Sequence, residues 1–304
     1  MKIIKLIFSL FAMLTLASAA YSSEILKMPP VVVGDKFGFT EGPVWVENKN
    51  MWLFTDIPKN KIYSLDSKGN VNIFMDDSGY ANGLMVDKDN NIWIAHHCRR
   101  VSYTTPDGKN NVVASKYNGK KFNSPNDLVQ AKDGSIWFTD PNYGIKLEGF
   151  GCELAEDEQP VRGIYRIKNG KVSLIDGSIE LPNGIAFSNN EKFLYVSNSA
   201  DGVVYRFDVN GDKLSNKITF AKVDDGKGPD ETWGFIADGL QIDKNDNLYV
   251  TGGPKGFALF SPKGKQIELF TVDSGFVSNV AIGGPKKNKL MVTAHEKLLI
   301  FDIK

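Results

Sequence analysis

A recurring pattern of two short strands constrains the fold of this chain most strongly. In each copy a polar residue precedes a short apolar run, a polar turn and a second apolar run that is rich in aromatic residues. The four clearest copies begin at Asn82, Asn126, Asn183 and Asp238. This pattern is typical of two antiparallel strands joined by a tight turn, which form the inner half of a four-stranded β-propeller blade.

Six copies can be counted when weaker ones beginning at Glu41 and Asn279 are included. Their first residues, which we call the heading residues, lie 41, 44, 57, 55 and 41 residues apart, close to the ~40–50 residues of common propeller repeats. The sequence therefore predicts an all-β, six-bladed β-propeller. The two long intervals predict insertions at 142–162 and 222–233, and long loops on a rigid scaffold often carry binding groups.

Both ends of the chain carry further signals. Residues 1–20 combine a basic start, a short apolar run and small residues, which predicts a secretory signal peptide and an exported, periplasmic or secreted protein. An uncleaved membrane anchor is the alternative, and no membrane association is expected after cleavage. The propeller is expected over residues 21–304, with a strand near Val31–Val33 pairing with the C-terminal blade and so closing the ring.

Charge and cysteine content limit the possible partners. The chain has 36 basic and 36 acidic residues, giving a formal net charge of zero, so there is no general electrostatic case for nucleic acid or an anionic membrane as partner. Cys98 and Cys152 follow the second strands of neighbouring predicted blades. A disulfide and two free thiols both remain open, because the sequence does not give the distance between them. The oligomeric state is not predicted.

Four heading residues from different blades are expected to converge at one end of the axial channel. They are Glu41, Asn126, Asn183 and Asp238, a set of carboxylate and amide oxygens. Such a set suits a hard divalent cation, Ca²⁺ foremost, with Mg²⁺, Mn²⁺ or Zn²⁺ as alternatives. For any single position the alternative is that Asn or Asp only closes a turn at the start of a strand.

Several longer segments resemble a known family. They are residues 39–45 (FTEGPVW), 123–128 (NSPNDL), 137–145 (WFTDPNYGI) and 181–188 (LPNGIAFS). The chain is similar along most of its length to the senescence-marker-protein/gluconolactonase-like group of six-bladed calcium propellers, and most of all to bacterial gluconolactonases. That resemblance implies a metal held by Glu41, Asn183 and Asp238, with Asn126 close to the metal or the substrate.

The resemblance also implies a function. We expect a hydrolase of carboxylic esters that opens a sugar lactone to the aldonic acid, with Asp238 and Asn126 as catalytic residues. Substrate contacts are expected from Asn126, Asn82 and His97. His97 could instead be a loop imidazole with a structural hydrogen bond, and Asp127 is a second candidate base, although its side chain could bond local backbone instead.

Two other readings stay open. One is a noncatalytic propeller whose metal stabilises the axis and whose rim binds a sugar or a protein. The other is a related propeller hydrolase such as a phosphotriesterase, because one scaffold can host different chemistries. A serine hydrolase is disfavoured, since the sequence contains no Gly-x-Ser-x-Gly motif.

Overall fold

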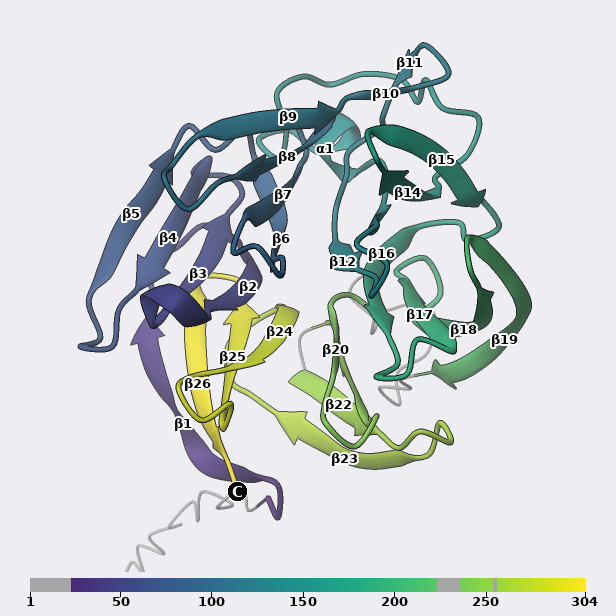
Figure 1. Cartoon of the computed structure of the whole chain (residues 1–304). Coiled ribbons are helices and arrows are strands. Elements are labelled where there is room, and N and C mark those ends of the chain that lie inside the picture. Colours follow the sequence, from purple (N-terminus) through teal and green to yellow (C-terminus); the bar gives the residue numbers. More distant parts are fainter. Residues whose placement is uncertain (1–22, 223–235, 254–255) are drawn as a thin grey trace, which may run out of the picture.

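The computed structural model describes residues 23–222, 236–253 and 256–304. The predicted signal peptide, 1–20, and nearly all of the predicted insertion at 222–233 lie outside these residues. The described chain forms six antiparallel four-stranded sheets arranged in a ring (Figure 1). The prediction of a six-bladed β-propeller is confirmed.

Each blade follows the chain from an inner strand to an outer one. The first two blades contain β2 (Thr40–Val46), β3 (Met51–Asp56), β4 (Lys61–Leu65) and β5 (Val71–Asp76), then β6 (Ala81–Val86), β7 (Ile92–His96), β8 (Arg100–Thr104) and β9 (Asn110–Ala114). The third and fourth contain β12 (Leu128–Gln130), β13 (Ile136–Thr139), β14 (Ile164–Lys168) and β15 (Lys171–Asp176), then β16 (Pro182–Phe187), β17 (Phe193–Asn198), β18 (Val203–Asn210) and β19 (Lys213–Lys222). The fifth contains β20 (Leu240–Ile242), β21 (Leu248–Thr251), β22 (Gly256–Phe260) and β23 (Gln266–Thr271).

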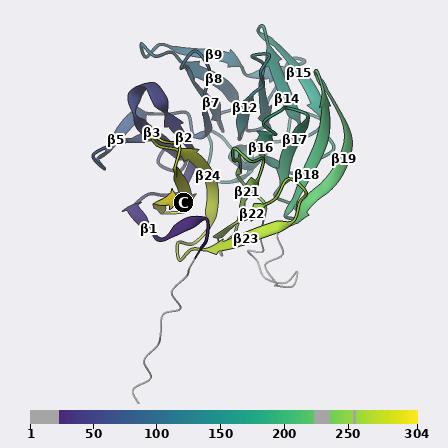
Figure 2. The same ribbon diagram turned by 60° about the horizontal axis from the view of Figure 1, so that its bottom comes forward.

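The sixth blade is built from both ends of the described chain. Its strands are β24 (Val277–Gly283), β25 (Lys289–Ala294), β26 (Lys297–Ile303) and β1 (Leu26–Gly34). Strand β1 pairs antiparallel with β26, with Val31 opposite Ile300 and Val32 opposite Leu299. The purple β1 beside the yellow β26 in Figures 1 and 2 shows this closure, which the sequence predicts.

The core consists of side chains that pack between neighbouring blades. All four residues of β13 are buried, because each blade is covered by a neighbour on both faces and its inner strands are therefore apolar on both sides. Burying one side chain such as Phe138 stabilises the fold by about 1.5–3 kcal/mol. The remaining elements are short: η1 (Glu47–Lys49), β10 (Lys116–Tyr117), β11 (Lys120–Lys121) and α1 (Tyr143–Lys146). Within the described chain, no helix has the length and apolar character needed to span a bilayer.

Hydrogen bonds between blades correct the predicted start of the sixth blade. A hydroxyl in the second strand of one blade donates to the backbone carbonyl of the next heading residue. Thr139 Oγ1 donates to Asn183 (2.6 Å), Ser197 Oγ donates to Asp238 (2.6 Å), and Thr251 Oγ1 donates to Ser278 (2.6 Å). Ser278, not Asn279, is therefore the sixth heading residue. The sequence prediction was one residue too late.

Candidate functional site at the propeller axis

The polar heading residues lie at the starts of the inner strands. Glu41 is in β2 and Asn183 is in β16. Asn126 and Asp238 lie just before the first residues of β12 and β20. All four are buried, with exposed fractions of 3–6%. The inner strands surround the centre of the ring (Figure 1). These residues therefore bring polar oxygens from four blades into the buried centre of the molecule.

Burial raises the pKa of three carboxyl groups near the axis, and the charge of Asp127 adds to the rise in the other two. Burial, helped by the negative charges of Glu41 and Asp127, raises the pKa of Asp238 well above its ordinary value, and the Asn183 side chain partly opposes this rise. Burial also raises the pKa of Glu41 to about 7, against hydrogen bonds from a backbone N–H and from the Asn279 amide. Burial raises the pKa of Asp127 to about 7. These groups share one region of low dielectric, in which three negative charges would be unfavourable.

The unsatisfied oxygens at the axis have the chemistry of a cation site. Asp238 Oδ1 is buried and has no hydrogen-bond partner in the described part of the chain. Asn183 Nδ2 donates to Ser199 Oγ at 3.1 Å, which leaves Asn183 Oδ1 available to a ligand. Hard divalent cations prefer such carboxylate and amide oxygens. Residues 23–222, 236–253 and 256–304 contain no close group of three or more His, Cys, Asp or Glu, so an ion here would need amide oxygens as well.

His97 holds Asn82 rather than acting as a free base. Its Nδ1 lies 2.7 Å from the Phe150 carbonyl oxygen, which can only accept, so Nδ1 carries the proton. His97 Nε2 therefore accepts from Asn82 Nδ2 at 3.0 Å. Burial lowers the pKa of His97 to about 4, which keeps the ring neutral at physiological pH. The structure thus favours the structural role for His97 and orients the Asn82 amide.

Asp127 connects two blades. Its Oδ1 accepts the backbone N–H of Leu128 (2.9 Å), and its Oδ2 accepts that of Ile185 in the fourth blade (3.4 Å). A side chain at Gly83 of the second blade would place its Cβ 2.8 Å from Asp127 Oδ1, so glycine is required there. Asp127 therefore bonds backbone, as the sequence analysis allowed, and acts on the site through its charge.

A cavity of about 1350 Å³ occupies the other end of the channel. It is lined by later residues of the inner strands, such as Val44 and Leu128, and by turn residues such as Lys244. Asp127 and Asn279 contribute to its wall, but Glu41, Asn126, Asn183 and Asp238 do not. The candidate site is therefore separate from this cavity, although both lie along the axis.

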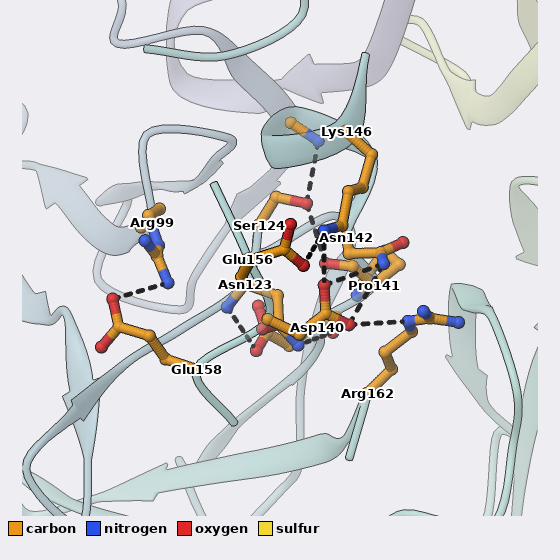
Figure 3. A network of polar contacts seen from close by, with 12 residues as sticks. Arg99, Asn123, Ser124, Asp140, Pro141, Asn142, Lys146, Glu156, Glu158 and Arg162 are labelled. Atoms are coloured by element: carbon orange, nitrogen blue, oxygen red, sulfur yellow. Dashed lines mark hydrogen bonds and ion pairs between the residues drawn. The ribbon is translucent and has the colours of Figure 1, made fainter. Parts of the chain in front are cut away.

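The predicted insertion at 142–162 lies between β13 and β14 and is fixed by polar contacts (Figure 3). Ser124 Oγ donates to the Pro141 carbonyl oxygen at 2.8 Å. Asn142 Nδ2 donates to both carboxylate oxygens of Asp157 at 3.1 Å, and Arg162 Nε lies 3.3 Å from the same carboxylate. These contacts tie the start of the insertion to its end.

A disulfide joins Cys98, just after β7, to Cys152 in the insertion, with 5.1 Å between their Cα atoms. The sequence left this bond open, and the structure forms it. The bond lies next to the contact between His97 and Phe150. It therefore links the second blade to the insertion beside the site.

We expect the double variant Cys98→Ser/Cys152→Ser to lose about 2–4 kcal/mol of unfolding free energy, because the cross-link restricts the unfolded chain. Denaturant unfolding followed by tryptophan fluorescence measures the loss. A reducing agent should destabilise the wild type by a similar amount and leave the double variant unchanged. A wild-type protein indifferent to reductant would show that the thiols are not joined.

Tyr143 is a candidate site residue that lies in the segment 137–145 and for which the sequence alone suggested no role. It begins α1 in the insertion, and its buried hydroxyl has no hydrogen-bond partner among the described residues. Burial, followed by the charge of Asp238, raises the pKa of this phenol, and Ser199 and Asn183, which lie close to the hydroxyl but outside regular hydrogen-bond geometry, oppose the rise. Tyr143 therefore lies beside two of the predicted metal ligands.

Comparison with known proteins agrees with this fold. The model of one family, described as SMP-30/Gluconolactonase/LRE-like region, matches residues 39–296. A gluconolactonase of Zymomonas mobilis is 33% identical over 292 residues, which cover 89% of this chain and 80% of the relative.

Solved structures show the same architecture. A gluconolactonase from Xanthomonas campestris superimposes with a TM-score of 0.82 at 27% identity, covering 90% of this chain and 89% of the other. A calcium-binding regucalcin from Agrobacterium tumefaciens superimposes with a TM-score of 0.73 at 17% identity, covering 91% and 95% of the two chains. The second likeness concerns the fold alone.

Proposed function

The chain belongs to the SMP-30/gluconolactonase/LRE-like family, and on that basis we propose that it hydrolyses a sugar lactone to the aldonic acid. The similarity to the Zymomonas mobilis gluconolactonase along most of the chain carries this proposal. The buried oxygens at the axis support it through the cation that they could hold, because ester hydrolysis needs a positive group or a donor to stabilise the negative charge that develops on the carbonyl oxygen.

We further propose that the reaction depends on a divalent cation, Ca²⁺ foremost, with Mg²⁺, Mn²⁺ or Zn²⁺ as alternatives. Glu41, Asn183 and Asp238 would hold it, with Asn126 as a further oxygen. The unpartnered Asp238 Oδ1 and the raised pKa values of Asp238 and Glu41 support this assignment. When bound, such a cation polarises the lactone carbonyl and neutralises the buried carboxylates.

The chain's own residues would then bind and orient the lactone. Asn126 holds the carbonyl oxygen or a hydroxyl group, and Asp238 either accepts a proton from the attacking water or attacks the ester itself. Asn82 has its Nδ2 committed to His97, so its Oδ1 accepts a hydrogen bond from a sugar hydroxyl. The oxygen of water bonds to the carbonyl carbon, the ring C–O bond breaks, and the proton of water goes to the released ring oxygen, which becomes a hydroxyl group.

We also propose that the protein is exported to the periplasm or the medium. The disulfide between Cys98 and Cys152 supports this, since such bonds persist in oxidising compartments. The predicted signal peptide at 1–20 remains a prediction.

The test is a pH-stat assay of purified protein on D-glucono-1,5-lactone and on γ-aldonolactones. We expect acid release above the spontaneous rate, loss of that activity with a chelator, and its recovery with Ca²⁺ or another divalent ion. Hydrolysis that persists after thorough chelation would show that the reaction does not depend on a divalent cation. No turnover of any lactone by metal-loaded protein would favour a binding module, and turnover of a phosphotriester instead would favour the related hydrolase.

A further inference from the structure

Resting on the proposed function, we propose that the Tyr143 hydroxyl donates a hydrogen bond to the carbonyl oxygen of the bound lactone. Tyr143 would then be a further catalytic residue, contributed by the insertion rather than by a heading position. The assignment rests on where its hydroxyl lies and on how firmly the surrounding loop holds it.

The Tyr143 hydroxyl is buried and has no hydrogen-bond partner of its own among the described residues. The side chain is half-buried, but its oxygen is fully buried and makes no hydrogen bond within the described part of the chain. Asp238, Asn183 and Ser199 are its polar neighbours. Asp238 Oδ1 is also without a partner. Two unsatisfied buried groups at the same place indicate that a ligand completes them.

An unpartnered hydroxyl alone would not identify a site, as a second tyrosine shows. Tyr165 in β14 also has a buried hydroxyl with no partner among the described residues. Its ring, however, is fully buried in a blade core and stacks on Phe138, with ring centroids 5.4 Å apart. What distinguishes Tyr143 is its place beside the axial site, because the next residue, Gly144, packs on His97, which is hydrogen-bonded to Asn82.

The backbone of α1 is fixed on the side of the third blade. Ser124 Oγ accepts the backbone N–H of Gly144 at 3.0 Å and donates to the carbonyl of Pro141 at 2.8 Å. The Asn123 N–H donates to Asp140 Oδ2 at 2.9 Å. Figure 3 shows Ser124, Asp140 and Pro141 close together. Tyr143 thus follows a rigid turn, which favours a well-defined position for its ring.

The second blade holds the other side of α1. A Cβ at Gly144 would fall 2.5 Å from His97 Cβ, so the helix backbone packs directly on His97. His97 is in turn bonded to Phe150, and Cys98 is joined to Cys152. The loop is therefore clamped between two blades, and preorganised donors are the kind that stabilise an oxyanion effectively.

In the reaction the donor would act without giving up its proton. As the oxygen of water bonds to the carbonyl carbon, negative charge moves to the carbonyl oxygen, and the hydrogen bond from Tyr143 strengthens. When the ring C–O bond breaks, the charge leaves the carbonyl oxygen, and the proton of water goes to the released ring oxygen, which becomes a hydroxyl group.

The test compares Tyr143→Phe with Tyr165→Phe, because each removes one buried, unpartnered hydroxyl and keeps the ring. With metal-loaded protein and D-glucono-1,5-lactone, we expect Tyr143→Phe to lower kcat about 100-fold, the lower end of the range for an oxyanion donor, with KM changed less than about threefold. Tyr165→Phe should keep wild-type kcat and KM. Wild-type kcat in Tyr143→Phe would overturn the proposal.

A binding measurement separates this proposal from the proposed function. Calorimetry with the non-hydrolysable D-gluconolactam should show affinity falling about three- to tenfold in Tyr143→Phe, as expected for one lost hydrogen bond, and unchanged in Tyr165→Phe. If the wild type binds the lactam but hydrolyses no lactone, the proposed function fails. The affinities of wild type and Tyr143→Phe for the lactam then still show whether the Tyr143 hydroxyl contacts the ligand. Equal affinities in all three proteins, or no lactam binding and no hydrolysis in the wild type, would overturn the role of Tyr143.

Discussion

Asp238→Asn is expected to lower kcat/KM for a sugar lactone about 1000-fold or more. The substitution removes a charge from the oxygens that would bind the cation, and metal polarisation of a carbonyl is worth several kcal/mol of transition-state stabilisation, where each 1.36 kcal/mol is a factor of ten. It also removes the proton acceptor proposed for the attacking water. The pH-stat assay at saturating Ca²⁺ measures the effect.

The matched control is Asp212→Asn, which makes the same chemical change at an exposed turn between β18 and β19 and should keep the wild-type rate. Calorimetric titration with Ca²⁺ adds a second measurement, in which Asp238→Asn should bind at least tenfold more weakly. Lost turnover with unchanged Ca²⁺ affinity would make Asp238 a base and not a ligand. A wild-type rate would remove Asp238 from the site altogether.

The blades were predictable because each inner strand pair carries its own local signal. The copy that begins at Asn183, for example, has an apolar run, a polar turn and a second apolar run, and the structure forms β16 and β17 there. Because both faces of a blade are packed against neighbours, its inner strands must be apolar runs, and such runs can be recognised in a single sequence.

The exact start of the sixth blade could not be predicted in the same way. Ser278 and Asn279 are both polar and both precede an apolar run, so the local pattern admits either as the heading residue. The hydrogen bonds that the Ser278 carbonyl accepts from Thr251 Oγ1 and from the Gly239 N–H fix the register. A slip of one residue reverses which face a side chain occupies, and so the error matters for the site.

The part of the site contributed by the insertion was hidden for a different reason. Residues 140–163 connect β13 to β14 with no repeating pattern, so nothing in the sequence says that Tyr143 returns to Asp238. The contact of His97 with Asn82 and the bond between Cys98 and Cys152 likewise depend on distances between segments. Their residue types made some of these side chains candidates in the sequence. Their roles became clear only from which side chains lie close together in the structure.

Glu41→Gln is expected to become more stable relative to the wild type as the pH rises, when the cation is absent. The pKa of Glu41 is about 7 in the folded protein against an ordinary value of 4.5. Between these pH values the native state holds a proton that the unfolded state has released, so the stability contributed by a protonated Glu41 is lost as the pH rises toward 7. The loss is about 3 kcal/mol, at about 1.36 kcal/mol for each unit of pKa.

The difference between the two proteins is the informative quantity, because other buried groups also titrate. Burial lowers the pKa of His96 to about 3 and that of His97 to about 4. These groups make stability rise with pH toward their ordinary value of 6.5, which opposes the carboxyl groups. Both histidines are present in wild type and variant, and so their contribution cancels in the difference.

Urea unfolding at pH 4.5, 6 and 8 with chelator should therefore show wild-type stability falling by about 3 kcal/mol relative to Glu41→Gln. Calcium should reverse this trend, because a cation binds the ionised carboxylate and stabilises the native state by about 2.7 kcal/mol at a concentration of 100 times Kd. At pH 8 the wild type should then gain more from Ca²⁺ than the variant does. Two results would contradict this prediction: stability that changes in parallel with pH in both proteins with chelator, or an equal gain in stability from Ca²⁺. Either would mean that Glu41 does not bind the cation through a buried carboxylate.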